Sequence, residues 1–174
     1  MILEIIVRID MAKASNPEKK SAGRLDAVDK KILDLLQDNA KLTIKEIGAR
    51  LHLTPTPVYE RIRRMEKQGI ISRYVALLNR ARTGNNLMAF CAVSLDTHKA
   101  EYISTFEKEA VKLAEVQECY HVAGQNDYLL KVTVTSMEEY QSFLAKKLAS
   151  LQHIGKVVSS LVMSEIKHTH KVRL

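Results

Sequence analysis

The most constraining feature of the sequence is the stretch from Thr54 to Gly69, which reads TPTPVYERIRRMEKQG. Thr54 is suited to cap a helix, Pro55 to occupy its first position and Gly69 to stand just past its end. At about 100° per residue, such a helix has an apolar face and a polar, basic face. The apolar face carries Val58, Ile62 and Met65, and the opposite face carries Thr56, Glu60, Arg63, Arg64 and Lys67. One face is therefore expected to pack and the other to meet a negatively charged partner.

Two shorter helices are predicted before this stretch. The first begins after Asp26, shows amphipathic spacing and ends near residues 38–39. The second opens at Thr43 and Glu46, which have the spacing of a capping box. It contains Gly48, and because a helical glycine costs about 1 kcal/mol relative to alanine, we expect a close helix crossing there. A short turn at residues 52–53 joins the second helix to the basic helix at residues 54–69, and these two form a helix-turn-helix. The first helix is expected to supply the third side of its small core.

Residues 70–78 are rich in β-forming side chains and predict a strand or small hairpin beside the helices. The sequence therefore indicates a winged helix-turn-helix over residues 24–78. A polar, turn-prone linker follows at residues 79–86. Before the first helix, residues 1–23 are predicted to be a flexible arm, and Met11 is an alternative start of the protein.

The second half of the chain alternates strand-like and helical patterns in the order βαββαβ. The expected strands are 87–95, 116–122, 128–135 and 157–163, and the expected helices are 98–114 and 137–151. This order predicts an α+β, ferredoxin-like sandwich over residues 87–166, followed by a basic tail at 167–174. One face of such a sheet has no helices. Phe90, Val122, Leu130 and Val132 indicate that this face is partly apolar, which predicts a dimer.

Charge and cysteine usage narrow the function. The net charge is +7, and residues 24–80 hold 12 Lys and Arg against 7 Asp and Glu, whereas residues 81–174 hold 11 against 10. The excess therefore lies around the helix at residues 54–69 and favours a polyanionic partner. Cys91 and Cys119 lie in apolar stretches without metal-ligand spacing, as expected of reduced thiols in the cytoplasm. Residues 1–10 are too short to span a bilayer and lack signal-peptide features, so no membrane association is expected.

Three segments are distinctive in their order and spacing: Leu25–Leu33 (LDAVDKKIL), Leu53–Ile71 (LTPTPVYERIRRMEKQGII) and Val122–Leu130 (VAGQNDYLL). Together they resemble the Lrp/AsnC family of bacterial and archaeal transcription regulators, also called leucine-responsive or feast/famine regulators. The resemblance covers about residues 25–171. It implies binding of double-stranded DNA and a homodimer formed through the C-terminal domain that often assembles into an octamer. It also implies a small effector, commonly an amino acid, bound where dimers meet.

The resemblance assigns the effector pocket to the glycine–aspartate turn and the last strand. The matching residues are Gly124, Gln125, Asn126 and Asp127 in the turn and Ser160, Leu161 and Val162 in the strand. Asp127 also fits an ordinary turn residue, so both interpretations stay open. Two positions depart from the family: His52 and Arg73 stand where glycine is common.

The candidate DNA-binding residues are Thr54, Thr56, Tyr59, Arg61, Arg63, Arg64 and Lys67, with Lys41 and Lys45 expected at the DNA backbone. A solvated charged face is the alternative for the basic residues. The sequence contains no nucleophile–base grouping, no phosphate-binding glycine loop and no metal-ligand cluster, so neither an enzyme nor a cofactor is expected. Two other functions stay open: an architectural DNA-binding protein without an effector, and an amino-acid-sensing regulatory module.

Overall fold

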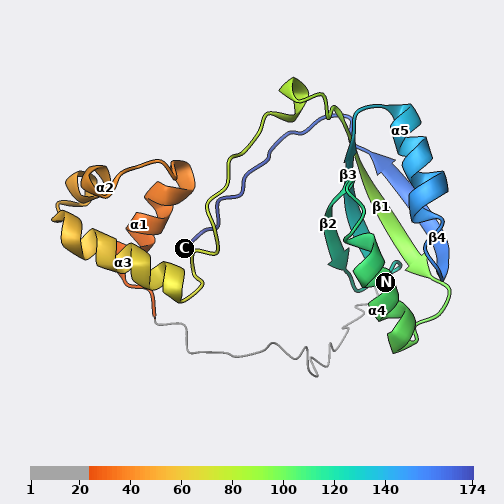
Figure 1. Ribbon diagram of the computed structural model, residues 1–174, viewed down its shortest axis with the longest axis horizontal. Coiled ribbons are helices and arrows are strands. Elements are labelled where there is room, and N and C mark those ends of the chain that lie inside the picture. The colour runs from red at the N-terminus through yellow and green to blue at the C-terminus, as the bar shows by residue number, and fades with distance from the viewer. Residues whose placement is uncertain (1–23) are drawn as a thin grey trace, which may run out of the picture. The chain divides into compact units, whose positions relative to one another are not determined.

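The computed structural model describes residues 24–174 (Figure 1). The predicted arm at residues 1–23 and the question of its start lie outside the described residues. The chain divides into two compact units. One comprises the residues up to Val75 together with Thr169–Leu174, and the other comprises Ala76–His168. The end of the basic tail therefore belongs with the N-terminal unit.

The N-terminal unit contains three helices: α1 (Ala27–Asp38), α2 (Ile44–Leu51) and α3 (Pro55–Lys67). Both predicted N-terminal caps are confirmed. The side chain of Asp26 accepts from the backbone N–H of Asp29, and that of Thr43 accepts from Glu46. The apolar faces of the helices enclose a small core of Ile32, Leu33, Ile47, Val58 and Met65. Helix α1 thus supplies the third side of the helix-turn-helix, as predicted.

The turn between α2 and α3 has unusual backbone geometry. His52 ends α2 in the left-handed conformation, at φ 55°, which L side chains adopt at a cost. Gly48 is required by the same turn, because a Cβ at this position would lie 2.6 Å from the carbonyl oxygen of Leu53. The expected close approach is therefore present, but its partner is the turn backbone and not a crossing helix.

Helix α3 begins and ends as the sequence indicated, but the segment after it differs from the prediction. Thr54 is the N-cap residue, although its side chain accepts no capping hydrogen bond from any described residue. Pro55 is the first helical residue, and Gly69 leaves the helix at φ 72°. The strand predicted at residues 70–78 is wrong, since no strand is present in this described segment. Its β-forming side chains find no neighbouring strand to pair with, and residues 72–78 are exposed.

The C-terminal unit has the predicted βαββαβ order. Its strands are β1 (Leu87–Leu95), β2 (Val116–His121), β3 (Tyr128–Val134) and β4 (Ile154–Leu161), and its helices are α4 (Ala100–Ala110) and α5 (Met137–Ser142). A π-helical turn, η2 (Phe143–Leu148), continues α5. The strands form one antiparallel sheet in the order β2-β3-β1-β4. A short 3-10 turn, η1 (Arg80–Arg82), lies in the predicted linker.

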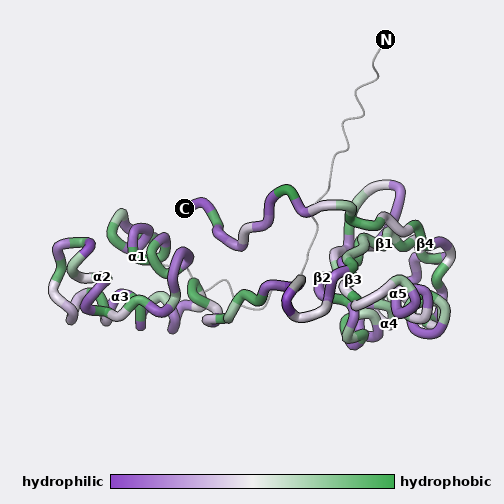
Figure 2. Tube along the Cα trace, turned by 90° about the horizontal axis from the view of Figure 1, so that it is seen from above, coloured by the Kyte–Doolittle hydropathy of each residue, from purple (hydrophilic) through white to green (hydrophobic). Residues whose placement is uncertain are grey.

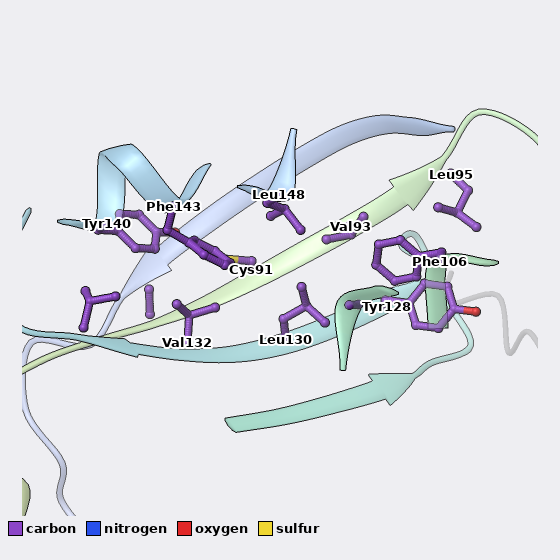
Figure 3. Packing of buried hydrophobic residues seen from close by; sticks show 13 residues of the cluster. Cys91, Val93, Leu95, Phe106, Tyr128, Leu130, Val132, Tyr140, Phe143 and Leu148 are labelled. Carbon is purple, nitrogen blue, oxygen red and sulfur yellow. The ribbon is translucent and has the colours of Figure 1, made fainter. Parts of the chain in front are cut away.

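Helices α4 and α5 cover the same face of this sheet (Figure 2). Figure 3 shows the core between this helical layer and the sheet, where Phe106 and Phe143 from the helical side meet alternate residues of β1 and β3. Leu130 and Val132 belong to this core and are fully buried. Their predicted place on the uncovered face is therefore wrong. Successive residues of a strand point to opposite faces of the sheet, and Leu130 and Val132 point to the same covered face as Cys91.

The uncovered face contains the other phase of each strand. Phe90 lies there as predicted, paired across the sheet with Lys131 of β3 and Ser160 of β4. Lys131 forms an ion pair with Glu118 of β2, with 2.7 Å between Nζ and Oε1. Val122, which was also expected on this face, lies beyond the end of β2.

Candidate functional site

The basic residues of α3 fall into two groups with different surroundings. Arg61 and Arg64 bind acidic residues at the start of α1. Arg61 Nη1 lies 2.6 Å from Asp26 Oδ2 and 2.7 Å from Asp29 Oδ1, and Arg64 Nη2 lies 2.6 Å from Asp29 Oδ2. The Asp29 side chain is only 1% exposed. These contacts join α3 to α1, so two of the predicted DNA-binding arginines already have carboxylate partners inside the unit.

The electrostatics of this network favour the charged forms. The backbone N–H of Asp29 and the guanidinium of Arg61 lower the pKa of Asp26. The two carboxylates, Asp26 first, raise the pKa of Arg61. A buried carboxylate that is paired and hydrogen-bonded orients its partners, because breaking either bond leaves a charge uncompensated. The network therefore holds α3 at a set angle on α1.

The second group of α3 residues points to solvent. Thr54, Thr56 and Tyr59 at the start of the helix are exposed, as are Arg63 and Lys67 further along. Among residues 24–174, Arg63 and Lys67 form no ion pair with an acidic side chain. They stand four residues apart, so they lie on one side of the helix. This side of α3 therefore carries two cations without acidic partners among residues 24–174, Arg63 and Lys67, and its N-terminal end is polar.

Helix α2 and the residues before it add further exposed cations. The predicted backbone contacts Lys41 and Lys45 are both exposed. Arg50, in the last turn of α2, is exposed as well and was not among the predicted residues. The sequence signal for Arg50 was its place in the first helix of the helix-turn-helix, which crosses the DNA backbone in this motif.

In the C-terminal unit, the turn at residues 122–127 is held by the side chain of Asp127. Its Oδ2 accepts the backbone N–H of Leu95 at 2.8 Å, and its Oδ1 lies 2.7 Å from His98 Nε2. These contacts lower the pKa of Asp127, with the Leu95 N–H as the main cause. Gly124 adopts φ 147° in this turn. Both carboxylate oxygens of Asp127 thus have partners within the chain.

The two groups of predicted effector residues are not brought together in one chain. The turn lies beside the end of β1, where the backbone N–H of Asp127 donates to Val93. Ser160 and Leu161 pair with residues 89–90, near the start of β1 on its other side, and the Val162 N–H donates to Met88. Four to six residues of strand separate the two groups, which is roughly 13–20 Å. One chain therefore does not place the two groups around a single small pocket.

A groove of about 400 Å³ lies elsewhere, between the π-helical turn η2 and strand β4. The groove is lined mainly by apolar side chains, which include Leu144, Leu148, Ile154 and Val157. Ser159 also lines it. None of the predicted effector residues is among the residues that line it.

Two other kinds of site are absent from the described part of the chain. No group of three or more His, Cys, Asp and Glu side chains in residues 24–174 is placed to hold a metal ion. No helix of those residues is long and apolar enough to cross a membrane.

Comparison with known proteins defines the class of protein. Residues 25–72 match the family model described as winged helix-turn-helix DNA-binding, and residues 88–172 match the Lrp/AsnC ligand binding domain. A DNA-binding unit followed by a ligand-binding domain is the organisation of a transcription regulator and not of an enzyme.

The relatives identify the family. The leucine-responsive regulatory protein of Haemophilus influenzae is 39% identical over 153 residues, which cover 88% of this chain and 92% of that protein. The protein of the same name from Escherichia coli K12 is 36% identical over 155 residues, covering 88% and 94%. This chain belongs to the Lrp/AsnC family of DNA-binding transcription regulators.

Solved structures agree in fold. A transcriptional regulator from Neisseria meningitidis, crystallised as an L-Met complex, is 35% identical with a TM-score of 0.83, covering 86% of this chain and 97% of that one. An AsnC family regulator from Agrobacterium tumefaciens is 32% identical with a TM-score of 0.82 and the same coverage. The predicted fold class is confirmed.

Proposed function

We propose that the exposed side of α3 reads DNA, with Thr54, Thr56 and Tyr59 entering the major groove first. Arg63 and Lys67 then contact bases or phosphates, while Lys41 and Lys45 contact the DNA backbone. The observation that carries this proposal is the division of the basic residues: Arg63 and Lys67 have no carboxylate partner among residues 24–174, whereas Arg61 and Arg64, although Arg64 is also exposed, bind carboxylates of α1. Arg61 and Arg64 are therefore assigned to positioning α3, and any DNA contact they make is secondary.

Duplexes selected from a random library by the wild-type protein provide the DNA for the test. The Arg63→Ala/Lys67→Ala double variant is expected to lose affinity for the selected duplex by more than about 100-fold, because two DNA contacts disappear at once. Fluorescence anisotropy measures the affinity. Glu60→Ala, on the same helix and also exposed, serves as the matched control and should not weaken binding. Retained affinity in the double variant would refute the assignment of this side of α3.

The ligand of the C-terminal domain is, in our proposal, an amino acid that changes DNA affinity or assembly. The family model describes a ligand-binding domain, and the relative from Neisseria meningitidis was crystallised with L-Met. An amino acid carries an ammonium and a carboxylate, so its site requires an anionic group and several donors. The turn at residues 124–127 offers the Asp127 carboxylate and backbone N–H groups, and residues 160–162 of another copy would close the site.

Assembly into a homodimer, and from dimers into an octamer, is part of the same proposal. The uncovered sheet face supports it, because this face exposes apolar side chains next to the Lys131–Glu118 ion pair. They include Phe90, Ala92, Leu129, Tyr120 and Val158. A face of this composition is better covered by a second sheet than by water. The protein would act in the cytoplasm, where the free thiols of Cys91 and Cys119 stay reduced.

Calorimetry against each of the twenty amino acids, combined with light scattering, tests the effector. At least one amino acid is expected to bind and to change either the mass or the DNA affinity. Asp127→Asn keeps the shape of the side chain and its hydrogen bond from Leu95 but removes the charge, so it should weaken that binding at least about 10-fold. Its thermal unfolding profile controls for damage to the turn. If no amino acid binds and the mass never changes, the architectural DNA-binding alternative replaces this proposal.

A further inference from the structure

The last residues of the chain contact the outer side of helix α1. Val172 forms two hydrogen bonds with the side chain of Gln37: its backbone N–H donates to Oε1 at 2.6 Å, and its carbonyl accepts from Nε2 at 3.1 Å. A paired donor and acceptor of this kind recognises extended backbone in one register, as a neighbouring strand would. The contact therefore fixes which backbone residue lies beside Gln37, and it does not depend on the Val172 side chain.

A charge contact stands next to these hydrogen bonds. Lys171 Nζ lies 2.9 Å and 3.0 Å from the two carboxylate oxygens of Asp38. The nearest oxygen of Asp34, one turn earlier on the same side of α1, is 3.9 Å away. Asp34, Gln37 and Asp38 thus form one surface, which we call the α1 end surface.

The α1 end surface has a physical need for a cation. The C-terminal end of a helix carries a partial negative charge, which basic residues in the last turn usually offset. Helix α1 has no basic residue in its last turn, which ends in Asp38, and Asp34 stands one turn earlier on the same side. Lys171 supplies the missing positive charge from a distant part of the sequence.

We propose that the α1 end surface is a docking site for the chain's own C-terminal segment, Thr169–Leu174. The DNA-binding unit is then attached to the C-terminal unit twice, once through the residues that follow α3 and once through the residues that follow β4. The second attachment begins directly after the strand that carries Ser160 and Leu161. This inference is independent of the proposed effector, because the docking contacts involve neither the turn at residues 122–127 nor a ligand.

Zero-length crosslinking tests the contact directly. A carbodiimide joins an amine to a carboxylate only when the two are in contact, so peptides containing Lys171 joined to Asp38 are expected by mass spectrometry. The experiment uses the full-length protein. Equal amounts of ¹⁴N and ¹⁵N material are unfolded, mixed in the unfolded state and then refolded together. Crosslinked peptides with both halves of one isotope support docking within a chain. Peptides of mixed isotope, or absence of the crosslink, would overturn the proposal.

Matched charge reversals test the specificity. Lys171→Glu is expected to release the segment, seen as faster amide hydrogen exchange at Val172 and at the last turn of α1. Arg173→Glu changes the charge of the same segment equally, but Arg173 forms no ion pair among the described residues, so it should leave exchange unchanged. Combining Lys171→Glu with Asp38→Lys should restore slow exchange. Equal effects of the two reversals, or no rescue, would show that the segment is held only by general charge attraction and would refute the site.

Discussion

Arg61 and Arg64 differ from Arg63 and Lys67 although all four residues lie within two turns of one helix. The first two meet the acidic start of α1, where Asp29 is almost fully buried. The other two are exposed and have no carboxylate partner among residues 24–174. Residue type and helical position on α3 were therefore insufficient to separate a side chain that holds the fold from one that is free to bind DNA. What separates them is the position of a carboxylate about thirty residues earlier in the chain.

The largest expected effect concerns the residue that creates this difference. Asp29→Ala removes the common partner of Arg61 and Arg64, so the free energy of unfolding of the N-terminal unit should fall by about 3 kcal/mol. Urea denaturation followed by hydrogen exchange of α1 and α3 amides measures the loss. The control is Glu60→Ala, which removes an exposed carboxylate from α3. Equal stability of the two variants would show that the network contributes nothing to the fold.

The next effect concerns the exposed pair. Arg63→Ala alone should weaken binding to a selected duplex by about 10- to 100-fold if it reads a base. Lys67→Ala alone should weaken binding to all duplexes alike and reduce the salt dependence by about one counterion, as expected of a phosphate contact. Anisotropy titrations over a range of salt concentrations separate the two. If Lys67→Ala shows the sequence-dependent loss and Arg63→Ala the uniform loss, the two roles are reversed. If Arg61→Ala loses DNA binding without losing stability, Arg61 is a DNA contact and the distinction between the two pairs is wrong.

A smaller effect is expected in the turn that places α3. Glycine at position 52 would adopt the left-handed backbone without steric cost, so His52→Gly should stabilise the N-terminal unit by up to about 1 kcal/mol. Thermal unfolding measures the gain. His52→Ala, which keeps the strain and removes only the imidazole, is the control and should not stabilise. A stability gain in His52→Ala would mean that the ring and not the backbone is unfavourable.

The smallest effect is a pH dependence. The pKa of Asp26 is lowered in the folded state, so its ionised form contributes stability above its ordinary pKa, and that contribution is lost as pH falls through the folded value. Asp26→Asn keeps a good helix cap but cannot ionise. The wild type should therefore unfold at a higher temperature than the variant near neutral pH, and the difference should close below about pH 4. A constant difference at all pH values would exclude the charge of Asp26 as its cause.

Much of the architecture could be predicted because its signals are local. The capping boxes at Asp26 and Thr43, the proline at position 55 and the glycine at position 69 each act within one turn of backbone. The predicted strand β1 matched at both ends, since its alternating apolar residues stop where the turn begins. The strand predicted at residues 70–78 failed because a strand needs a neighbour, which β-propensity does not supply.

The candidate sites divide in the same way. The sequence was sufficient to identify the basic helix and the glycine–aspartate turn, which are contiguous stretches. It did not reveal that Arg61 and Arg64 already have partners, or that Asp127 binds both Leu95 and His98. Nor did it show that residues 124–127 and 160–162 lie at different ends of β1.

The sequence by itself determined the order of elements, the two units' fold classes and the concentration of positive charge around α3, because helix caps, turn residues and periodicity act over a few residues. Only the tertiary structure decided which arginines are neutralised, which face of the sheet is uncovered and where the C-terminal segment lies. These depend on contacts between residues far apart in the chain, such as Asp29 with Arg64 and Asp38 with Lys171. Such contacts form only once packing brings distant surfaces together.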